Sequence, residues 1–190
     1  EFEEVDLDEE LPAQIKAQIE ANPSAACDVL KKAVTDEFKN IEDPQNDLKA
    51  LDAYLWGLGF TKDPRAVETI VAVLKNYRTA TGFAALGRIG NESAMEFLLK
   101  EMEHEPDPRL NSEILLRLAE KKYAPVMAKT ENLFKSEESG FQLQVLFGML
   151  GDVGVPFLLQ KINDPNRGAR LHAMFLLGLW ICPVEAAAPL

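Results

Sequence analysis

Residues 83–102, FAALGRIGNESAMEFLLKEM, have the pattern of one complete helix, turn and helix. Apolar and small residues recur at helical spacing before Gly87 and Gly90, which we expect to close the first helix and turn the chain. Asn91 is a good cap for a second helix, whose apolar residues form a single stripe at i, i+3, i+4 and i+7. Two short helices with one buried stripe each cannot enclose a core by themselves. They therefore need stacked neighbours.

Copies of this hairpin recur on both sides of it. A large apolar residue followed by glycine falls near the end of each first helix, and Leu116-Arg117 fills the one remaining slot. The successive steps are 28, 30, 31 and 30 residues, which is the signature of a repeat protein. The four pairs with glycine are Leu58-Gly59, Leu86-Gly87, Phe147-Gly148 and Leu177-Gly178. The matching positions of the second helices are Ala66, Ala94, Ala124 and Val155.

The period and the absence of alternating strand patterns predict an all-α protein, a right-handed α-solenoid of helical hairpins. We expect residues 1–10 to be an acidic, disordered tail and residues 11–46 to form N-terminal capping helices. Residues 47–190 are expected to hold about four and a half repeats in a single continuous domain.

The repeats resemble HEAT-like repeats, in particular the short variety of phycobilisome lyases and many bacterial scaffold proteins. The resemblance covers residues 47–190, and the second and fourth units match well. Lys62 stands where the first unit should have its turn glycine, and Arg117 and Glu120 replace both glycines of the third unit. The residues that carry the resemblance are Arg78 and Arg170, Ala85-Leu86-Gly87, Ile89-Gly90-Asn91 and the run from Ala94 to Leu99.

Most of the formal charge of −11 lies in the N-terminal region. Residues 1–46 carry 13 acidic and 4 basic side chains, whereas residues 47–190 carry 18 and 16. Seven acids in the first ten residues favour a solvated tail. Because residue 1 is glutamate, we expect that the native start of the chain was either trimmed or removed with a signal peptide. Localisation stays open, with the cytoplasm favoured.

Aspartate followed by proline occurs four times, and capping explains each occurrence. The aspartate accepts from unpaired amides, while proline at the first helical position loses no hydrogen bond. We therefore predict a helix start, and no catalytic role, at Asp43, Asp63, Asp107 and Asp164.

Few residues of the sequence match a catalytic or metal-binding motif. His104-Glu105 is a candidate metal-binding pair, because deoxyhypusine hydroxylase also resembles HEAT repeats and binds two irons through four such pairs. This chain has one pair and only two histidines, which argues against a metal site. No phosphate loop, paired cysteines with metal spacing or nucleophile elbow is present in the sequence. The sequence favours a protein without catalysis, cofactor or metal. Scattered basic residues argue against nucleic acid, and no apolar run reaches the ~20 residues of a membrane span.

The resemblance implies that second helices line the concave face and present the binding surface. The leading hypothesis is a non-enzymatic protein–protein interaction module or scaffold. A bilin lyase or chaperone of chromophore proteins is the second, and an immunity or inhibitor protein is the third. A lyase should shift the visible spectrum of a free tetrapyrrole, whereas a scaffold should retain a protein. The candidate binding residues are Glu68, Glu96, Lys100, Lys129, Gln160 and Lys161.

The helix expected from about Leu171 to Cys182 is apolar nearly all round, so one neighbouring repeat can cover only one side of it. The following segment, PVEAAAPL, is too short to form a second helix of three turns. We therefore expect either that the chain continues past Leu190 or that this end, with Leu177 and Trp180, packs against another molecule such as a second copy.

Overall fold

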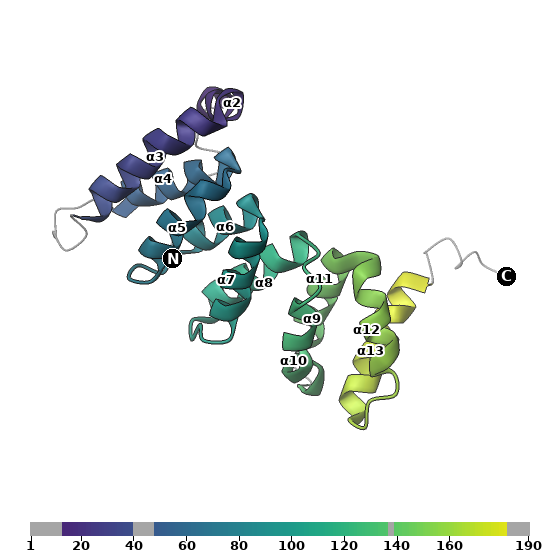
Figure 1. Cartoon of the computed structure of the whole chain (residues 1–190). Coiled ribbons are helices and arrows are strands. Elements are labelled where there is room, and N and C mark those ends of the chain that lie inside the picture. Colours follow the sequence, from purple (N-terminus) through teal and green to yellow (C-terminus); the bar gives the residue numbers. More distant parts are fainter. Residues whose placement is uncertain (1–12, 40–47, 137–138, 182–190) are drawn as a thin grey trace. The chain divides into compact units, whose positions relative to one another are not determined.

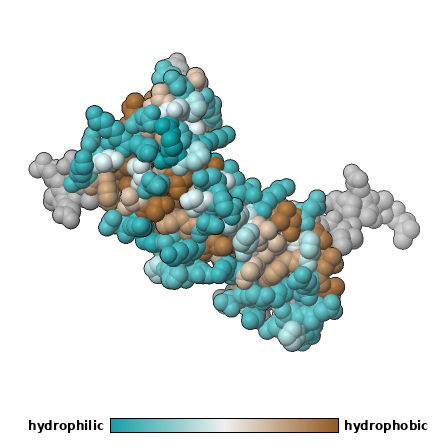
Figure 2. All heavy atoms as spheres, viewed as in Figure 1, coloured by the Kyte–Doolittle hydropathy of each residue, from teal (hydrophilic) through white to brown (hydrophobic). Residues whose placement is uncertain are grey.

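The structure, a computed structural model, describes residues 13–39, 48–136 and 139–181. Every regular element in these ranges is helical, which confirms the all-α class (Figure 1). The chain divides into two compact units, residues 1–117 and residues 118–190. On the face drawn in Figure 2, hydrophilic surface (teal) alternates with apolar surface (brown) in both units.

The regular elements of the first unit are helices, with α8 ending three residues beyond its boundary. The elements are α2 (Ala13–Ala21), α3 (Pro23–Phe38), α4 (Leu48–Thr61), η1 (Pro64–Ala66), α5 (Val67–Leu74), α6 (Ala80–Ile89), α7 (Glu92–Met102) and α8 (Pro108–Glu120). In the expected hairpins, α4 and α6 are first helices, and α5 and α7 are their second helices. The helix starts predicted at Asn91 and Asp107 are confirmed, because each side chain accepts a hydrogen bond from a backbone amide of its helix.

Helix α4 packs against both α3 and α6, and its contact with α6 is unusually close. A Cβ atom added at Gly59 would lie 2.8 Å from the Cα atom of Ala85 in α6. Leu51, Leu55 and Leu58 of α4 are fully buried around this approach. The missing side chain at Gly59 therefore allows the two first helices to touch through their backbones.

Four turns between the described helices contain a residue with positive φ, and two of these residues, Lys62 and Gly90, stand where the sequence predicts the turn. Gly87 lies inside α6, and Gly90 ends that helix with φ 65°. The expectation that Gly87 closes the helix is therefore wrong. Gly87 instead leaves space for Arg117, because an added Cβ would lie 2.6 Å from the Cβ atom of Arg117. The turn positions of the other hairpins are Lys62, Lys122 and Gly151, with φ of 50°, 53° and 64°.

The left-handed lysines offer a simple test of these turns. A side chain with a Cβ is strained at positive φ, and glycine is not. We expect Lys62→Gly to raise the free energy of unfolding by roughly 0.5–1 kcal/mol, measured by urea denaturation. Lys75→Gly is the control, since Lys75 has φ −64° and should lose stability on the same substitution. A loss in both variants would contradict the assigned turn conformation.

The expectation that every Asp-Pro pair starts a helix is only partly correct. Asp63 caps η1, but Asp164 does not cap the last helix, which begins at Arg167. There the side chain of Asn166 accepts from the amide of Ala169, and Asp164 instead closes the preceding turn by accepting from the amide of Asn166. Asp43 lies outside the described residues.

The second unit surrounds a small aromatic cluster. Its elements are α9 (Val126–Lys129), α10 (Glu131–Lys135), α11 (Gly140–Leu150), η3 (Gly151–Gly154), α12 (Val155–Lys161) and α13 (Arg167–Ile181). Phe134 meets Phe147 edge to face at 5.5 Å, and Phe147 stacks on Phe157 at 6.1 Å. Because Phe134 and Phe147 are fully buried, this cluster forms the centre of the unit.

One stretch of the described chain, Gly140–Lys161, is long and apolar enough to cross a membrane by length and composition. In the structure this stretch consists of α11, η3 and α12, and the backbone turns at Gly151. Helices that contribute to a protein core pass the same test, and both α11 and α12 contribute to the aromatic cluster.

Several expectations concern residues that the structure does not describe. The acidic tail at residues 1–10, the segment at residues 182–190 and the side chain of Trp180 lie outside the described residues. The single continuous domain over residues 47–190 stays a prediction beside the two compact units.

Candidate binding groove on the first unit

Two adjoining cavities lie along the second helices of the first unit. One, of about 270 Å³, lies between α3 and α5, and the other, of about 420 Å³, extends from α3 past η1 to the start of α7. Glu68 lines both cavities, so they adjoin at this residue, and we call the two together the α3–α5–α7 groove. The first cavity is lined by Val34, Thr35, Phe38, Glu68, Thr69, Ala72 and Val73. The second is lined by Lys31, Pro64, Arg65, Val67, Glu68, Asn91 and Ser93.

The end of the groove between α3 and α5 is apolar. Val34 and Val73 form its floor and are almost completely buried, while Phe38 and Ala72 border it. This arrangement follows from helical spacing, because residues three and four apart on α3 share one face. The hydroxyl of Thr35, which also lines this cavity, donates to the backbone oxygen of Lys31 at 2.7 Å. This end of the groove is suited to an apolar side chain.

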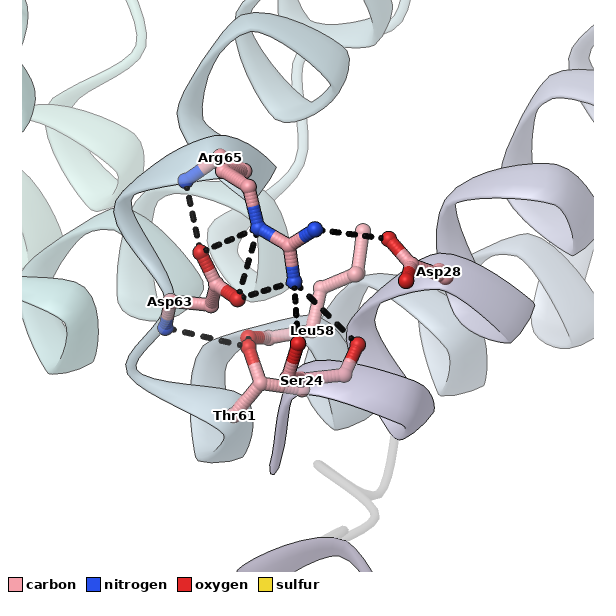
Figure 3. Close-up of polar contacts among 6 residues, drawn as sticks. All are labelled: Ser24, Asp28, Leu58, Thr61, Asp63 and Arg65. Carbon is pink, nitrogen blue, oxygen red and sulfur yellow. Dashed lines mark hydrogen bonds and ion pairs between the residues drawn. The ribbon is translucent and has the colours of Figure 1, made fainter. Parts of the chain in front are cut away.

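The other end is polar and is held by a network around Arg65 (Figure 3). The guanidinium donates to Asp63 through Nε and Nη2, the shortest bond being 2.6 Å. It also donates to Asp28 Oδ1 at 3.0 Å and to Ser24 Oγ at 2.8 Å, both on α3. Arg65 thus ties η1 to the N-terminal half of α3 and fixes the polar edge of the groove.

Thr61 and Asp63 place Arg65 in this position. The hydroxyl of Thr61 donates to the backbone oxygen of Leu58 at 2.7 Å and accepts from the amide of Asp63 at 3.2 Å. Asp63 Oδ1 then accepts from the backbone amide of Arg65 at 2.9 Å, which caps η1. The turn and the network are therefore one hydrogen-bonded assembly. Cys27 is fully buried beside it, and burial raises the pKa of the Cys27 thiol.

The Arg65 network predicts a specific dependence of stability on pH. Hydrogen bonds from the side chain and backbone of Arg65 hold the pKa of Asp63 below its ordinary value. A carboxyl with a lowered folded pKa stabilises the fold above its unfolded pKa, and this contribution is lost as the pH falls through the folded pKa. Asp63→Asn keeps a helix cap but removes the charge. We therefore expect the wild type to melt at a higher temperature than Asp63→Asn at pH 7.

The difference in melting temperature between the wild type and Asp63→Asn should shrink as the pH falls through the lowered pKa of Asp63. Asp36→Asn is the control, because the Asp36 side chain is 58% exposed and pairs with Lys39, only three residues further along the chain. A difference for Asp63→Asn that stays constant from pH 7 to pH 2.5 would contradict the assigned cause.

Of the six residues predicted to bind, Glu68 is the one that lines the groove. Lys161 is buried, with 8% of its surface exposed, so the expectation that it faces solvent is wrong. Its ammonium lies between Glu131 and Asp164 Oδ2, at 2.5 and 2.8 Å, and ties α12 to α10. The remaining four are solvent-exposed and lie outside the groove: Glu96, Lys100, Lys129 and Gln160.

The sequence interpretation missed the contribution of α3 because it treated this helix as an end cap. Lys31, Thr35 and Phe38 recur at i, i+4 and i+7 with buried Val34 between them, and that spacing already indicates a face of α3 directed at a neighbour. The role of Arg65 had no such signal, because its partners Ser24 and Asp28 lie far away in the sequence.

The His104-Glu105 pair has a structural explanation. Glu105 is buried and accepts from Arg78 and from the amide of Asp107, whereas His104 is exposed at the end of α7. Among the described residues, no group of three or more His, Cys, Asp or Glu side chains is arranged to hold a metal ion.

Comparison of the chain with protein-family models, curated proteins and solved structures found no match. The fold and the groove define the class of protein in physical terms: an all-helical protein with an open groove lined by α3, η1, α5 and the start of α7.

Proposed function

We propose that this chain is a right-handed solenoid of HEAT-like hairpins with an N-terminal helical cap, and that it binds a protein partner in the α3–α5–α7 groove without catalysing a reaction. The observation that carries the proposal is the groove itself, an open depression shared by α3, η1, α5 and α7. Grooves along the second helices are where repeat proteins bind extended partners.

Long-range polar contacts support the repeat architecture. Thr79 donates to Asp52, and Arg78 donates to Glu105, each across 27 residues. Lys161 donates to Glu131 across 30 residues. Contacts between neighbouring hairpins at about one repeat length are expected when each repeat packs mainly on the next.

The lining of the groove indicates the chemistry of the partner. The apolar end accommodates one or two aliphatic or aromatic side chains, and the polar end offers Lys31, Asn91 and Ser93 to a backbone or a polar side chain. Glu68, at the junction, favours a basic residue beside the apolar anchor. The partner is therefore a protein segment with an apolar anchor and an adjacent basic residue.

The test compares two alanine-to-arginine variants. Ala72 is exposed and borders the apolar end, so Ala72→Arg should fill the groove without changing the core. Ala17 on α2 is also exposed and does not line the groove, so Ala17→Arg is the matched control. The immobilised chain is used to capture proteins from a cell extract, and each captured protein is purified for calorimetry.

A partner of the groove should bind the wild type and Ala17→Arg equally and bind Ala72→Arg at least tenfold more weakly. Glu68→Lys should lower the affinity as well, because the groove would then repel the basic residue. If no captured protein distinguishes Ala72→Arg from Ala17→Arg, the proposal is wrong.

A further inference from the structure

An exposed apolar stripe runs along α13 in the second unit. Its four large side chains fall at i, i+3, i+4 and i+8 on one face of the helix. They are Leu171, Met174, Phe175 and Leu179, with exposed fractions of 51, 50, 56 and 46%. We call them the α13 stripe. Figure 2 shows brown apolar surface over the second unit, where α13 lies.

The opposite face of α13 is already occupied. Ala169, Ala173, Leu176 and Leu177 are buried against the rest of the second unit. The expectation that Leu177 takes part in self-association is therefore wrong, because Leu177 is 8% exposed and belongs to the covered side. The α13 stripe is the side of this helix on which the large side chains stay about half exposed.

The repeat pattern identifies the kind of neighbour that fits the stripe. Leu177-Gly178 holds the same position in α13 as Leu58-Gly59 holds in α4. In the first unit, Gly59 is the point where the next first helix approaches to backbone contact. A Cβ atom at Gly178 would meet nothing within 4 Å, and Gly178 lies within the stripe. The position of Gly178 is open, as that of Gly148 is, so another helix can approach the stripe there as closely as α6 approaches Gly59.

We propose that the α13 stripe binds the α13 stripe of a second copy of this chain, with the two helices antiparallel. The stripe supplies its own partner, because an apolar face paired by two-fold symmetry is complementary to itself. Charge sets the direction. Arg167 is exposed in the first turn, and an antiparallel pair places it beside the C-terminal end of the other α13, where the helix dipole is negative. A parallel pair would place the two Arg167 side chains together.

The size of the stripe sets the strength of the pair. Four half-exposed large side chains present on the order of 400 Å² per copy, so a pair buries about 800 Å², below the ~1,200 Å² of most stable interfaces. The dimer is therefore weak, and a dissociation constant of roughly 10–500 μM is expected.

The first experiment is sedimentation equilibrium of the full chain from 5 μM to 1 mM. The weight-average mass of the wild type should rise toward twice the chain mass. Phe175→Glu should remain a monomer throughout, and Met174→Lys, a second variant, should do the same. Phe141→Glu on α11 is the matched control, since Phe141 is 76% exposed and lies outside the stripe, and it should associate like the wild type. Circular dichroism confirms that each variant keeps its helix content.

The second experiment tests the antiparallel arrangement by cross-linking. In a Cys182→Ser background, chains with Leu171→Cys are mixed with chains with Leu179→Cys and treated with a short bismaleimide; the remaining Cys27 is buried. The mixture should yield cross-linked dimers at least fivefold faster than either variant alone. Three outcomes would each overturn the proposal. The wild type could be monomeric at all concentrations, or Phe141→Glu could weaken the dimer as much as Phe175→Glu does. Either cysteine variant alone could also form cross-linked dimers faster than the mixture.

Discussion

Gly59→Ala should lower the free energy of unfolding by about 1–3 kcal/mol, although alanine is normally the better helix former. The added methyl group would lie 2.8 Å from the Cα atom of Ala85 and 3.3 Å from its backbone oxygen. A backbone cannot rotate away as a flexible side chain can, so α4 and α6 would have to separate. Because this helix pair has fully buried leucines on both sides, separation would open space in the core.

The control for Gly59→Ala is Gly148→Ala, at the same repeat position in α11. A Cβ atom there would meet nothing within 4 Å, and Gly148 is exposed. Alanine should therefore raise the free energy of unfolding by roughly 0.5–1 kcal/mol, through helix propensity and a less flexible unfolded chain. Urea denaturation measures both. Changes of the same sign would show that the close approach at Gly59 does not govern the effect.

Arg78→Ala should lower the free energy of unfolding by roughly 2–3 kcal/mol, because it leaves a carboxylate buried without its cation. The Glu105 side chain is 2% exposed, and its Oε2 lies 2.5 Å from the guanidinium of Arg78. Arg78 also pairs with Glu101 at 2.7 Å and is itself 34% exposed, so solvent reduces the loss below that of a fully buried pair.

Two further variants identify the cause of the loss in Arg78→Ala. Combining it with Glu105→Gln should recover part of the stability, because the amide carries no charge and can still accept from the amide of Asp107. Arg109→Ala, in which an exposed arginine is removed, should change stability by no more than about 0.5 kcal/mol. An equal loss in Arg78→Ala and Arg109→Ala would contradict a role for the buried carboxylate.

Local chemistry allowed the hairpin at residues 83–102 to be predicted well. Asn91 caps α7, and Met95 and Leu98 are buried, as the cap preference and the 3.6-residue period indicate. The positions of Gly59 and Gly87 were also found. Their purpose was not, because a helix terminus and a close approach between helices both select glycine, and the sequence does not distinguish them.

Features that depend on contacts between distant residues could not be predicted from the sequence. The burial of Lys161 requires Glu131 and Asp164 on both sides of it, and a pattern reading of α12 alone places a lysine in solvent. The third hairpin divides its expected second helix into α9 and α10 at Thr130, whose hydroxyl donates to the backbone oxygen of Met127. A hydrogen bond of this kind competes with the hydrogen bonds of the helix. It forms here because Thr130 is completely buried, which the sequence does not reveal.

The same limit applies to the groove. Glu68 was predicted because second helices are expected to carry the exposed positions of a repeat, but Lys31 and Phe38 belong to α3 and contribute only through the packing of α3 beside α5. The spacing on α3 indicates a face directed at a neighbour, but it does not show that this face borders an open groove.

The backbone contact between α4 and α6 also determines the order in which the first unit loses structure. Helices that meet through side chains can move apart gradually, since rotamers adjust to a small gap. At Gly59 there is no side chain to adjust, so any opening removes the contact at once. The amides of α4 and α6 should therefore exchange with solvent deuterium together, as one cooperative unit, and later than those of α2, most of whose residues with described side chains are exposed.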